Sequence, residues 1–248
     1  MLLEVLFMKL KSFTIPYLTD ERLEYAKEYL VDNGYSYVED VASADFVILP
    51  IPVKKYMFDK LEDKTVFYGV GDYKGFDYNK IKAFLLENAF LTSEGAIALY
   101  KENSNMSIYN SKVLITGYGR IAQALHKALA ALGADVTVCS RSKESIALSR
   151  FNGASHITFD ELAVKNDYDI VFNTVPHIIF TKAELDALGS DVTLIDLASF
   201  PGGVDTLYAK SKGIKLIDGK RLPSRYSKKS AGYLIGKTIN QIIKEDFS

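Results

Sequence analysis

The sequence lacks the features that mark several large classes of protein. Its 248 residues include one cysteine, Cys139, so no disulfide can form within the chain. Lys and Arg number 30 against 31 Asp and Glu, which provides neither a basic field for nucleic acid nor a polybasic tail for a membrane surface. We find no internal repeat, low-complexity tract or cluster of metal ligands. The expectation is a soluble cytoplasmic enzyme that binds no metal, nucleic acid or membrane.

The apolar start of the chain is too short to be a membrane segment. Residues 1–7 are apolar apart from Glu4, carry no basic leader, and fall far short of the roughly 20 apolar residues that span a bilayer. They are interpreted either as a first strand or as non-native vector sequence with Met8 as the true start. The length of the chain exceeds one typical domain and suits two.

A short apolar strand pattern at residues 112–116 runs directly into a glycine turn at residues 117–122. Gly117 permits a tight turn, Gly119 lets the backbone approach a pyrophosphate, and the small Ala122 lets the next helix lie close to the sheet. The first amides of that helix, together with its dipole, favour phosphate. The residues predicted to bind the cofactor here are Gly117, Gly119, Arg120 and Ile121.

A helix and a second strand follow the turn at the expected distances. Apolar residues recur at three- and four-residue spacing until Gly133, a predicted helix cap: Ile121, Leu125, Leu129 and Leu132. Residues 135–139 form the next predicted strand, on which Cys139 is expected to be a buried, inert thiol. A glycine pattern alone is a weak signal. With a strand before it and a helix and strand after it, the pattern predicts a dinucleotide-binding domain.

The residues that end this second strand favour NADP over NAD. NAD-binding domains commonly place Asp or Glu roughly 20 residues after the glycines, where it binds the ribose 2′-hydroxyl. Ser140, Arg141, Ser142 and Lys143 occupy that stretch here. None of these residues has a carboxylate that would repel a 2′-phosphate, and together they provide a guanidinium, an ammonium and two hydroxyls that can bind it. Ser140, Arg141 and Ser142 are therefore predicted to bind NADP; the alternative is a solvated basic turn.

Strands alternate with helices along the chain, which predicts parallel sheets. The predicted fold class is α/β with a two-domain Rossmann-like architecture: a doubly wound parallel sheet that binds NADP, plus a smaller flavodoxin-like α/β domain. We divide the chain into an N-terminal substrate-side domain at residues 1–91, a connecting helix and linker at 92–110, the NADP-binding domain at 111–229, and a C-terminal helix at 230–248 that returns toward the first domain. The connecting helix is expected to begin near Thr92.

Three segments are expected where a nicotinamide ring would lie. Residues 173–176 and 198–205 follow the fourth and fifth strands of the NADP-binding domain, at the edge where such sheets bind ligands. Residues 222–232 form a predicted loop with basic side chains at a helix start, which suits carboxylate recognition. Residues 49–52 follow a strand of the first domain and are interpreted either as a ligand loop or as a rigid loop. The expected cofactor contacts of the first segment are Thr174, Val175 and Pro176.

Four segments of the chain resemble the A subunit of bacterial dipicolinate synthase. They are residues 92–97, 173–176, 195–205 and 222–232. The Asp-Leu-Ala-Ser-x-Pro-Gly-Gly-Val-Asp string that ends at Asp205 is the specific part, whereas the glycine turn is shared with many dehydrogenases. The resemblance covers the chain from about Thr92 onward. It implies oxidation of dihydrodipicolinate to dipicolinate with NADP as hydride acceptor, in sporulating bacteria, alongside a flavoprotein-like B subunit.

The chain departs from this family in two places. The first domain is short and matches loosely, and the usual Leu-Pro-Gly-Lys of the family is Leu-Pro-Ser-Arg at residues 222–225. Ser224 adds a side chain where glycine left room for a ligand or a turn, while Arg225 keeps the positive charge. A synthase subunit that has drifted and a related protein with another substrate both fit these departures.

A cyclic dicarboxylate substrate requires cations that hold its carboxylates and a group that takes a proton as the ring aromatises. Arg225 is the expected carboxylate clamp, with Lys228 and Ser199 as further substrate-binding residues. Glu94 is the candidate base, and Ser93 beside it is the second candidate catalytic residue and a helper in carboxylate binding. Alternatives stay open: Glu94 is also explained as a favourable negative charge in the first turn of a helix, and water can accept the proton.

The three histidines are given little weight. His126 and His156 are expected to be structural, and His177 follows Pro176 at the cofactor edge. Two alternatives to dipicolinate synthesis remain. One is a reductase of another small carboxylate on the same two-domain plan, and the other is a non-catalytic nucleotide-binding subunit or sensor. The sequence leaves the oligomeric state open, including a homo-oligomer.

Overall fold

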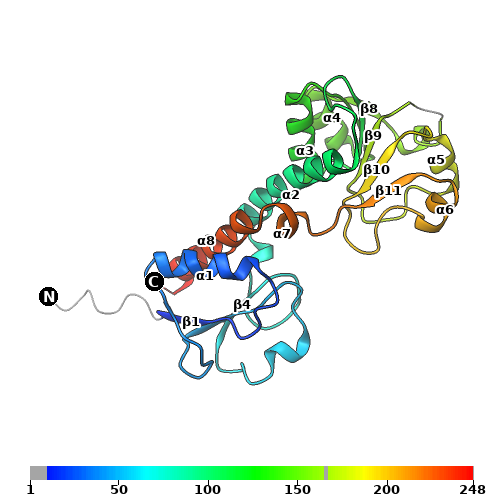
Figure 1. Cartoon of the computed structure of the whole chain (residues 1–248). Helices are drawn as coiled ribbons and strands as arrows, with labels where there is room; N and C mark the ends of the chain where they lie inside the picture. Colours follow the sequence, from blue (N-terminus) through cyan, green and yellow to red (C-terminus); the bar gives the residue numbers. More distant parts are fainter. Residues whose placement is uncertain (1–9, 165–166, 248) are drawn as a thin grey trace. The chain divides into compact units, whose positions relative to one another are not determined.

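The computed structural model describes residues 10–164 and 167–247 (Figure 1). Their contacts divide the chain into two compact units. The first unit comprises the described residues up to Asn88 together with those from Pro223 onward, and the second is continuous from Ala89 to Leu222. Residues 1–7, for which the sequence left two interpretations, lie outside the described ranges. Within those ranges no helix is long and apolar enough to cross a membrane.

Six parallel strands build the sheet of the second unit. They are β6 (Lys112–Thr116), β7 (Asp135–Cys139), β8 (Ser155–Ile157), β9 (Ile170–Asn173), β10 (Thr193–Asp196) and β11 (Lys215–Asp218). Their order is β11-β10-β9-β6-β7-β8, and every neighbouring pair is parallel. This is the doubly wound order, in which the direction of strand addition reverses between β6 and β9. The predicted Rossmann-like sheet is confirmed.

Helices and short helical turns connect these strands. They are α3 (Arg120–Ala131), α4 (Lys143–Phe151), η3 (Phe159–Glu161), α5 (Lys182–Ala187) and α6 (Thr206–Ser211). Local capping explains where two of them begin. The Ser142 hydroxyl accepts from the Ser145 amide at the start of α4, and Thr181 and Glu184 form a reciprocal capping box at the start of α5.

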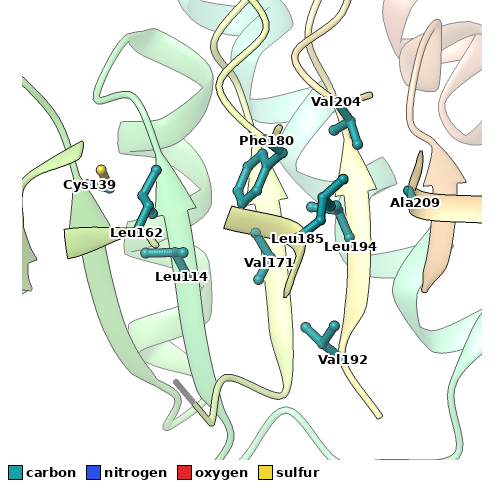
Figure 2. Close-up of a cluster of buried hydrophobic side chains, with 10 residues drawn as sticks. All are labelled: Leu114, Cys139, Leu162, Val171, Phe180, Leu185, Val192, Leu194, Val204 and Ala209. Atoms are coloured by element: carbon teal, nitrogen blue, oxygen red, sulfur yellow. The ribbon is translucent and has the colours of Figure 1, made fainter. Parts of the chain in front are cut away.

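One face of this sheet is buried under α5, α6 and the loops beside them (Figure 2). Leu114, Val171 and Leu194 are paired in register across β6, β9 and β10, so their side chains form a continuous apolar row. Phe180 and Leu185 cover that row. Because all five side chains are at most 1% exposed, the three central strands are fixed relative to one another. Their carboxyl ends therefore provide a rigid base for the loops that follow.

Five parallel strands build the sheet of the first unit. They are β1 (Ser12–Thr14), β2 (Ser36–Tyr37), β3 (Phe46–Ile48), β4 (Thr65–Tyr68) and β5 (Phe76–Asp77), with η1 (Lys55–Phe58) and η2 (Tyr78–Lys80) as short turns between or after them. Their order is β2-β1-β3-β4-β5. This is the flavodoxin-like order, with its reversal between β1 and β3. The smaller flavodoxin-like domain of the predicted fold class is confirmed.

Two helices from distant parts of the sequence pack together in the first unit. α1 (Arg22–Asp32) and α8 (Lys228–Asp246) share the most extensive helix contact of the described residues (Figure 1). Two glycines of α8 permit this approach. A Cβ at Gly232 would lie 2.2 Å from the Arg22 carbonyl oxygen, and one at Gly236 would lie 2.9 Å from the Ala26 carbonyl oxygen. Side chains at either position would push the helices apart.

Two predicted boundaries are wrong. α2 (Lys82–Asn103) begins ten residues before the expected start near Thr92, since the Thr-Ser-Glu sequence that looked like a helix start lies inside a continuous helix. Its earlier turns already bury Phe84 and Ala89. Residues 222–226, expected as part of a loop, form the one-turn helix α7 (Leu222–Tyr226), where Pro223 is tolerated because the first turn does not need its amide.

Candidate functional site

The glycine turn between β6 and α3 has the geometry that a phosphate needs. Gly117 has a φ of +83°, and a Cβ there would lie 2.6 Å from Thr174 Oγ1, so the turn tolerates only glycine without strain. Gly119 differs, because an added Cβ would meet no described heavy atom within 4 Å. Gly119 is also the N-cap of α3 and provides no side-chain cap. The space beside Gly119 at the amino end of α3 is therefore open, which is what the approach of a phosphate to the first amides of the helix requires.

Tyr118, between the two glycines, anchors the turn to the protein interior. It is 5% exposed, and its hydroxyl lies 2.8 Å from His126 Nδ1 and accepts from Asn152 Nδ2 at 3.2 Å. Gln123 Nε2 donates to the Tyr118 carbonyl at 2.9 Å. Burial raises the pKa of Tyr118 and lowers the pKa of His126, so both stay neutral near pH 7. Sequence reasoning missed this anchor, which gives His126 a defined structural role.

The predicted 2′-phosphate residues lie in the turn between β7 and α4. Ser140 is buried, and its Oγ lies 3.3 Å from His156 Nε2. Ser142 is the N-cap of α4, and its hydroxyl accepts from the Ser145 amide at 3.0 Å. Arg141 is exposed between them. One acidic residue, Glu144, lies in the first turn of α4, immediately after residues 140–143.

A buried polar network joins the carboxyl ends of β6, β9 and β10. Thr116 Oγ1 donates to Asn173 Oδ1 at 2.6 Å, and Asn173 Nδ2 donates to Asp196 Oδ1 at 2.7 Å. The Asp196 carboxylate also accepts from the amides of Ala198 and Gly203, each at 3.1 Å. Asp196 is 8% exposed, so these three N–H groups replace most of its hydration.

This network sets the course of the two loops expected at the cofactor edge. The Val175 amide donates to Asn173 Oδ1 at 3.0 Å. Gly202 has a φ of +91°, and a Cβ added there would lie 2.8 Å from Asp196 Oδ2, so the position has no room for a side chain. A Cβ at Gly203 would lie 2.1 Å from Asn173 Nδ2. The adjacent glycines of residues 202–203 are thus explained by the buried Asn and Asp behind them. The available sequence signal was an Asp followed shortly by two glycines.

The loops present a mixed surface beyond this network. Ser199 is exposed, and Phe200 beside it is 89% exposed, although large apolar side chains are usually covered. Thr174 and Val175 are half-buried, and the Thr174 hydroxyl donates to the Thr116 carbonyl at 2.7 Å. Pro176 and His177 are exposed.

The remaining predicted site residues fall in both units. In the second unit, Ser93 is buried and donates to the Phe90 carbonyl of its own helix at 2.8 Å, while Glu94 is exposed. The interpretation of Glu94 as a first-turn residue is wrong, because α2 begins at Lys82. In the first unit, Arg225 lies with its guanidinium carbon 5.3 Å from the centre of the Tyr226 ring, and Lys228 pairs with Glu21. Lys228 therefore already has an anionic partner.

Two other features carry no nucleotide chemistry. Burial raises the pKa of the Cys139 thiol to about 12, so this cysteine is not a nucleophile.

An open polar pocket lies at the amino ends of β10 and β11, the edge opposite the glycine turn, and is lined in part by Thr193, Asp191 and Glu102. Lys215 crosses it and donates to the carbonyl of Asn103 near the end of α2. The described residues contain no group of three or more His, Cys, Asp or Glu arranged to hold a metal ion.

Comparison with known proteins places these features in a family context. Residues 86–199 match the domain family described as D-isomer specific 2-hydroxyacid dehydrogenase, NAD binding domain. The chain is also similar to the A subunit of dipicolinate synthase from Bacillus subtilis (strain 168), with 33% identity over 159 residues. The aligned part covers 64% of this chain and 54% of that relative, so the match spans about half of the length of the relative.

Two solved structures show that dipicolinate synthase A subunits have the same fold as this chain. The A subunit of dipicolinate synthase from Bacillus halodurans has a TM-score of 0.84 at 21% identity, covering 96% of this chain and 99% of that one. The corresponding protein from Bacillus subtilis has a TM-score of 0.83 at 24% identity, covering 95% and 96%. The resemblance inferred from the motifs is therefore confirmed: the chain is similar in sequence to one dipicolinate synthase A subunit and has the same fold as two solved ones.

Proposed function

We propose that the chain is an NADP-dependent dehydrogenase that oxidises dihydrodipicolinate to dipicolinate. The matched dehydrogenase domain supports an oxidoreductase that uses a nicotinamide dinucleotide. The observation that carries the substrate is the alignment to a protein named as the A subunit of dipicolinate synthase. In the proposed reaction the dihydropyridine ring loses a hydride and a proton and becomes aromatic, while NADP is reduced to NADPH.

The second unit is proposed to hold the cofactor. Gly117 and Gly119, with the amides of Arg120 and Ile121, would bind the pyrophosphate, because the space in front of α3 is open. Residues 174–176 would lie along the nicotinamide end. The bound cofactor supplies the hydride acceptor, and the protein supplies its orientation through the buried network behind these loops.

The choice of NADP over NAD rests on the turn after β7. Arg141 is exposed there, with Ser140 and Ser142 on either side. A guanidinium can hold a phosphate through two parallel hydrogen bonds. Glu144 lies in the first turn of the following helix and opposes this preference, so the charge of Arg141 must outweigh it. The relative affinities of NADPH and NADH measure this balance directly.

Substrate binding is proposed to use Arg225 as the carboxylate clamp, assisted by Ser199. Lys228 contributes less than the sequence suggested, because Glu21 already pairs with it. Glu94 is the proposed proton acceptor, since its carboxyl group is exposed on α2. Ser93 donates inside its helix and so supports the position of α2 in addition to any contact with substrate.

The test is a coupled assay that supplies freshly generated dihydrodipicolinate and NADP and follows the appearance of dipicolinate and NADPH. We expect the wild-type protein to form equal amounts of both products and the Gly119→Val variant to form neither. A panel of other small carboxylates identifies the alternative reductase if only a different acid turns over. Tight NADPH binding without turnover of any acid identifies the non-catalytic alternative.

The relative is named as one subunit of a synthase, which supports a second protein in the active assembly. We propose that this partner is a flavoprotein-like B subunit. The same assay with and without the B subunit of a dipicolinate synthase tests it. Turnover by the chain alone at the rate of the mixture would remove the partner from the proposal.

A further inference from the structure

A second cluster of polar groups lies in the first unit, at the carboxyl edge of its five-stranded sheet. Asp20 and Arg22 come from the segment that follows β1 and from the start of α1, and Tyr78 comes from η2, directly after β5. Ile51 follows β3 and Gly69 follows β4. Parallel sheets of this order bind ligands at this edge, beside the reversal between β1 and β3. None of these residues is part of the nucleotide site.

Asp20 and Arg22 form a buried, two-pronged ion pair. Arg22 Nε donates to Asp20 Oδ1 at 2.8 Å, and Arg22 Nη2 donates to Asp20 Oδ2 at 2.7 Å, with the two side chains 12% and 6% exposed. The carboxylate is also held by the amides of Arg22 at 3.2 Å and Ile51 at 3.4 Å. A guanidinium has five N–H donors, and Asp20 takes two of them. Three donors of a nearly buried cation therefore have no acceptor among the described residues.

Tyr78 adds an unpartnered hydroxyl to the same cluster. Tyr78 is fully buried, and its hydroxyl is the buried side-chain polar atom that has no hydrogen-bond partner among the described residues. A Cβ added at Gly69 would lie 2.7 Å from both the Tyr78 ring and the Ile51 side chain, so the ring is held against the end of β4. Burial raises the pKa of Tyr78, and the charges of Arg22 and Asp20 both act on its hydroxyl. A neutral tyrosine that donates is the form present near pH 7.

We propose that this cluster is a carboxylate-binding site in which Arg22 and Tyr78 donate hydrogen bonds to the ligand. The groups left over are donors: a guanidinium provides only donors, and a neutral phenol donates one. Their natural complement is an acceptor with a negative charge, and a carboxylate suits the planar guanidinium. The Arg22 side chain is 12% exposed, so part of this otherwise buried cluster reaches the surface. The identity of the ligand rests on the proposed function, in which the carboxylate is one of the two on dipicolinate.

The first test is Tyr78→Phe, which removes the hydroxyl and breaks no hydrogen bond within the part of the chain that the structure describes. We expect the melting temperature of the free protein to stay level or rise, because an orphaned buried hydroxyl is lost. Calorimetry with saturating NADPH should show dipicolinate binding about tenfold more weakly. The matched control is Tyr35→Phe in the same unit, where the hydroxyl donates to Asn240 Oδ1 at 3.0 Å. That variant should lose stability and bind dipicolinate like the wild type.

The second test replaces the ion pair by a neutral pair, Asp20→Asn with Arg22→Gln, so that no charge is left buried alone. The wild type should bind dipicolinate at least tenfold more tightly than picolinate, which has one carboxylate. The double variant should lose most of this preference while its NADPH affinity stays unchanged. If Tyr78→Phe and the double variant both bind dipicolinate as tightly as the wild type, this cluster is not a carboxylate-binding site.

Failure of the inference and failure of the proposed function give different results. Turnover of dihydrodipicolinate with unchanged KM in both variants keeps the function and removes the site. Binding of malonate or picolinate that depends on Arg22 and Tyr78, without any binding of dipicolinate, keeps the site and removes the substrate. Absence of binding by all three acids to the wild-type protein removes both.

Discussion

Replacing Gly119 by valine should abolish nucleotide binding and leave the fold intact. An added Cβ at Gly119 meets no described heavy atom within 4 Å, and the backbone φ of −77° is ordinary for any residue. The valine methyl groups would then occupy the space in front of α3, where a pyrophosphate must approach. The cost to folding is limited to a poorer N-cap, about 0.5–1 kcal/mol.

Gly117 provides the matched comparison two residues earlier. Gly117→Ala places a Cβ at a φ of +83° and 2.6 Å from Thr174 Oγ1, which donates to the Thr116 carbonyl. The left-handed backbone costs about 1–2 kcal/mol and a displaced hydrogen bond about 1 kcal/mol. At roughly 2–4 °C for each kcal/mol, the melting temperature should fall by roughly 4–12 °C.

The assay is thermal unfolding by circular dichroism together with calorimetric titration of NADPH. The expected pattern is Gly119→Val with near-normal melting and no NADPH binding, and Gly117→Ala with a clearly lower melting temperature. A Gly119→Val protein that melts normally and binds NADPH with wild-type affinity would show that the space before α3 is not the phosphate site. The explanation of the glycine turn would then be wrong at its first step.

Three further predictions follow from other parts of the structure. Arg141→Ala should weaken NADPH at least tenfold, about 1.4 kcal/mol, with NADH nearly unchanged, and equal wild-type affinities for the two cofactors by calorimetry would contradict this. Arg225→Ala should weaken dipicolinate binding by about 1.5–3 kcal/mol and leave NADPH affinity unchanged. Arg225→Lys should restore part of the lost binding energy. An alanine variant that binds dipicolinate as tightly as the wild type would exclude Arg225 from the site. Burial lowers the pKa of His126 below its ordinary value of 6.5, so its unfolded form takes up a proton first and stability should fall as the pH drops below about 6.5. Melting curves of the wild type and His126→Gln between pH 7.5 and 5 test this, and parallel curves would contradict it.

Local sequence patterns predicted the nucleotide unit well. The strand before Gly117, the helix after it and the next strand are each defined by the apolar spacing of neighbouring residues between 112 and 139, and such short-range patterns survive in the fold. The start of α2 was misplaced because a Thr-Ser-Glu sequence resembles a helix start wherever it occurs. Only the burial of Phe84 and Ala89 shows that the helix began earlier, and burial is a property of tertiary packing.

The parts of the site that were missed depend on contacts over long distances in the sequence. Thr116 and Asn173 are separated by 57 residues, and Asn173 and Asp196 by 23. No periodicity links such residues, and each alone resembles an ordinary polar residue at a strand end. The same holds for Tyr118, whose partners His126 and Asn152 lie 8 and 34 residues further along the chain. Parallel strands bring these side chains together only once the sheet order is known.

The division of the chain has a consequence for biosynthesis. The second unit is one uninterrupted stretch, whereas the first needs α8, which is translated after all of that stretch. The second unit needs no later segment to complete its sheet, whereas α1 exposes the apolar face that α8 covers until α8 has been made. A released chain that ends at residue 227 should therefore bind NADPH while its N-terminal part stays sensitive to protease. The first unit therefore begins at the start of the chain but is the last to be completed.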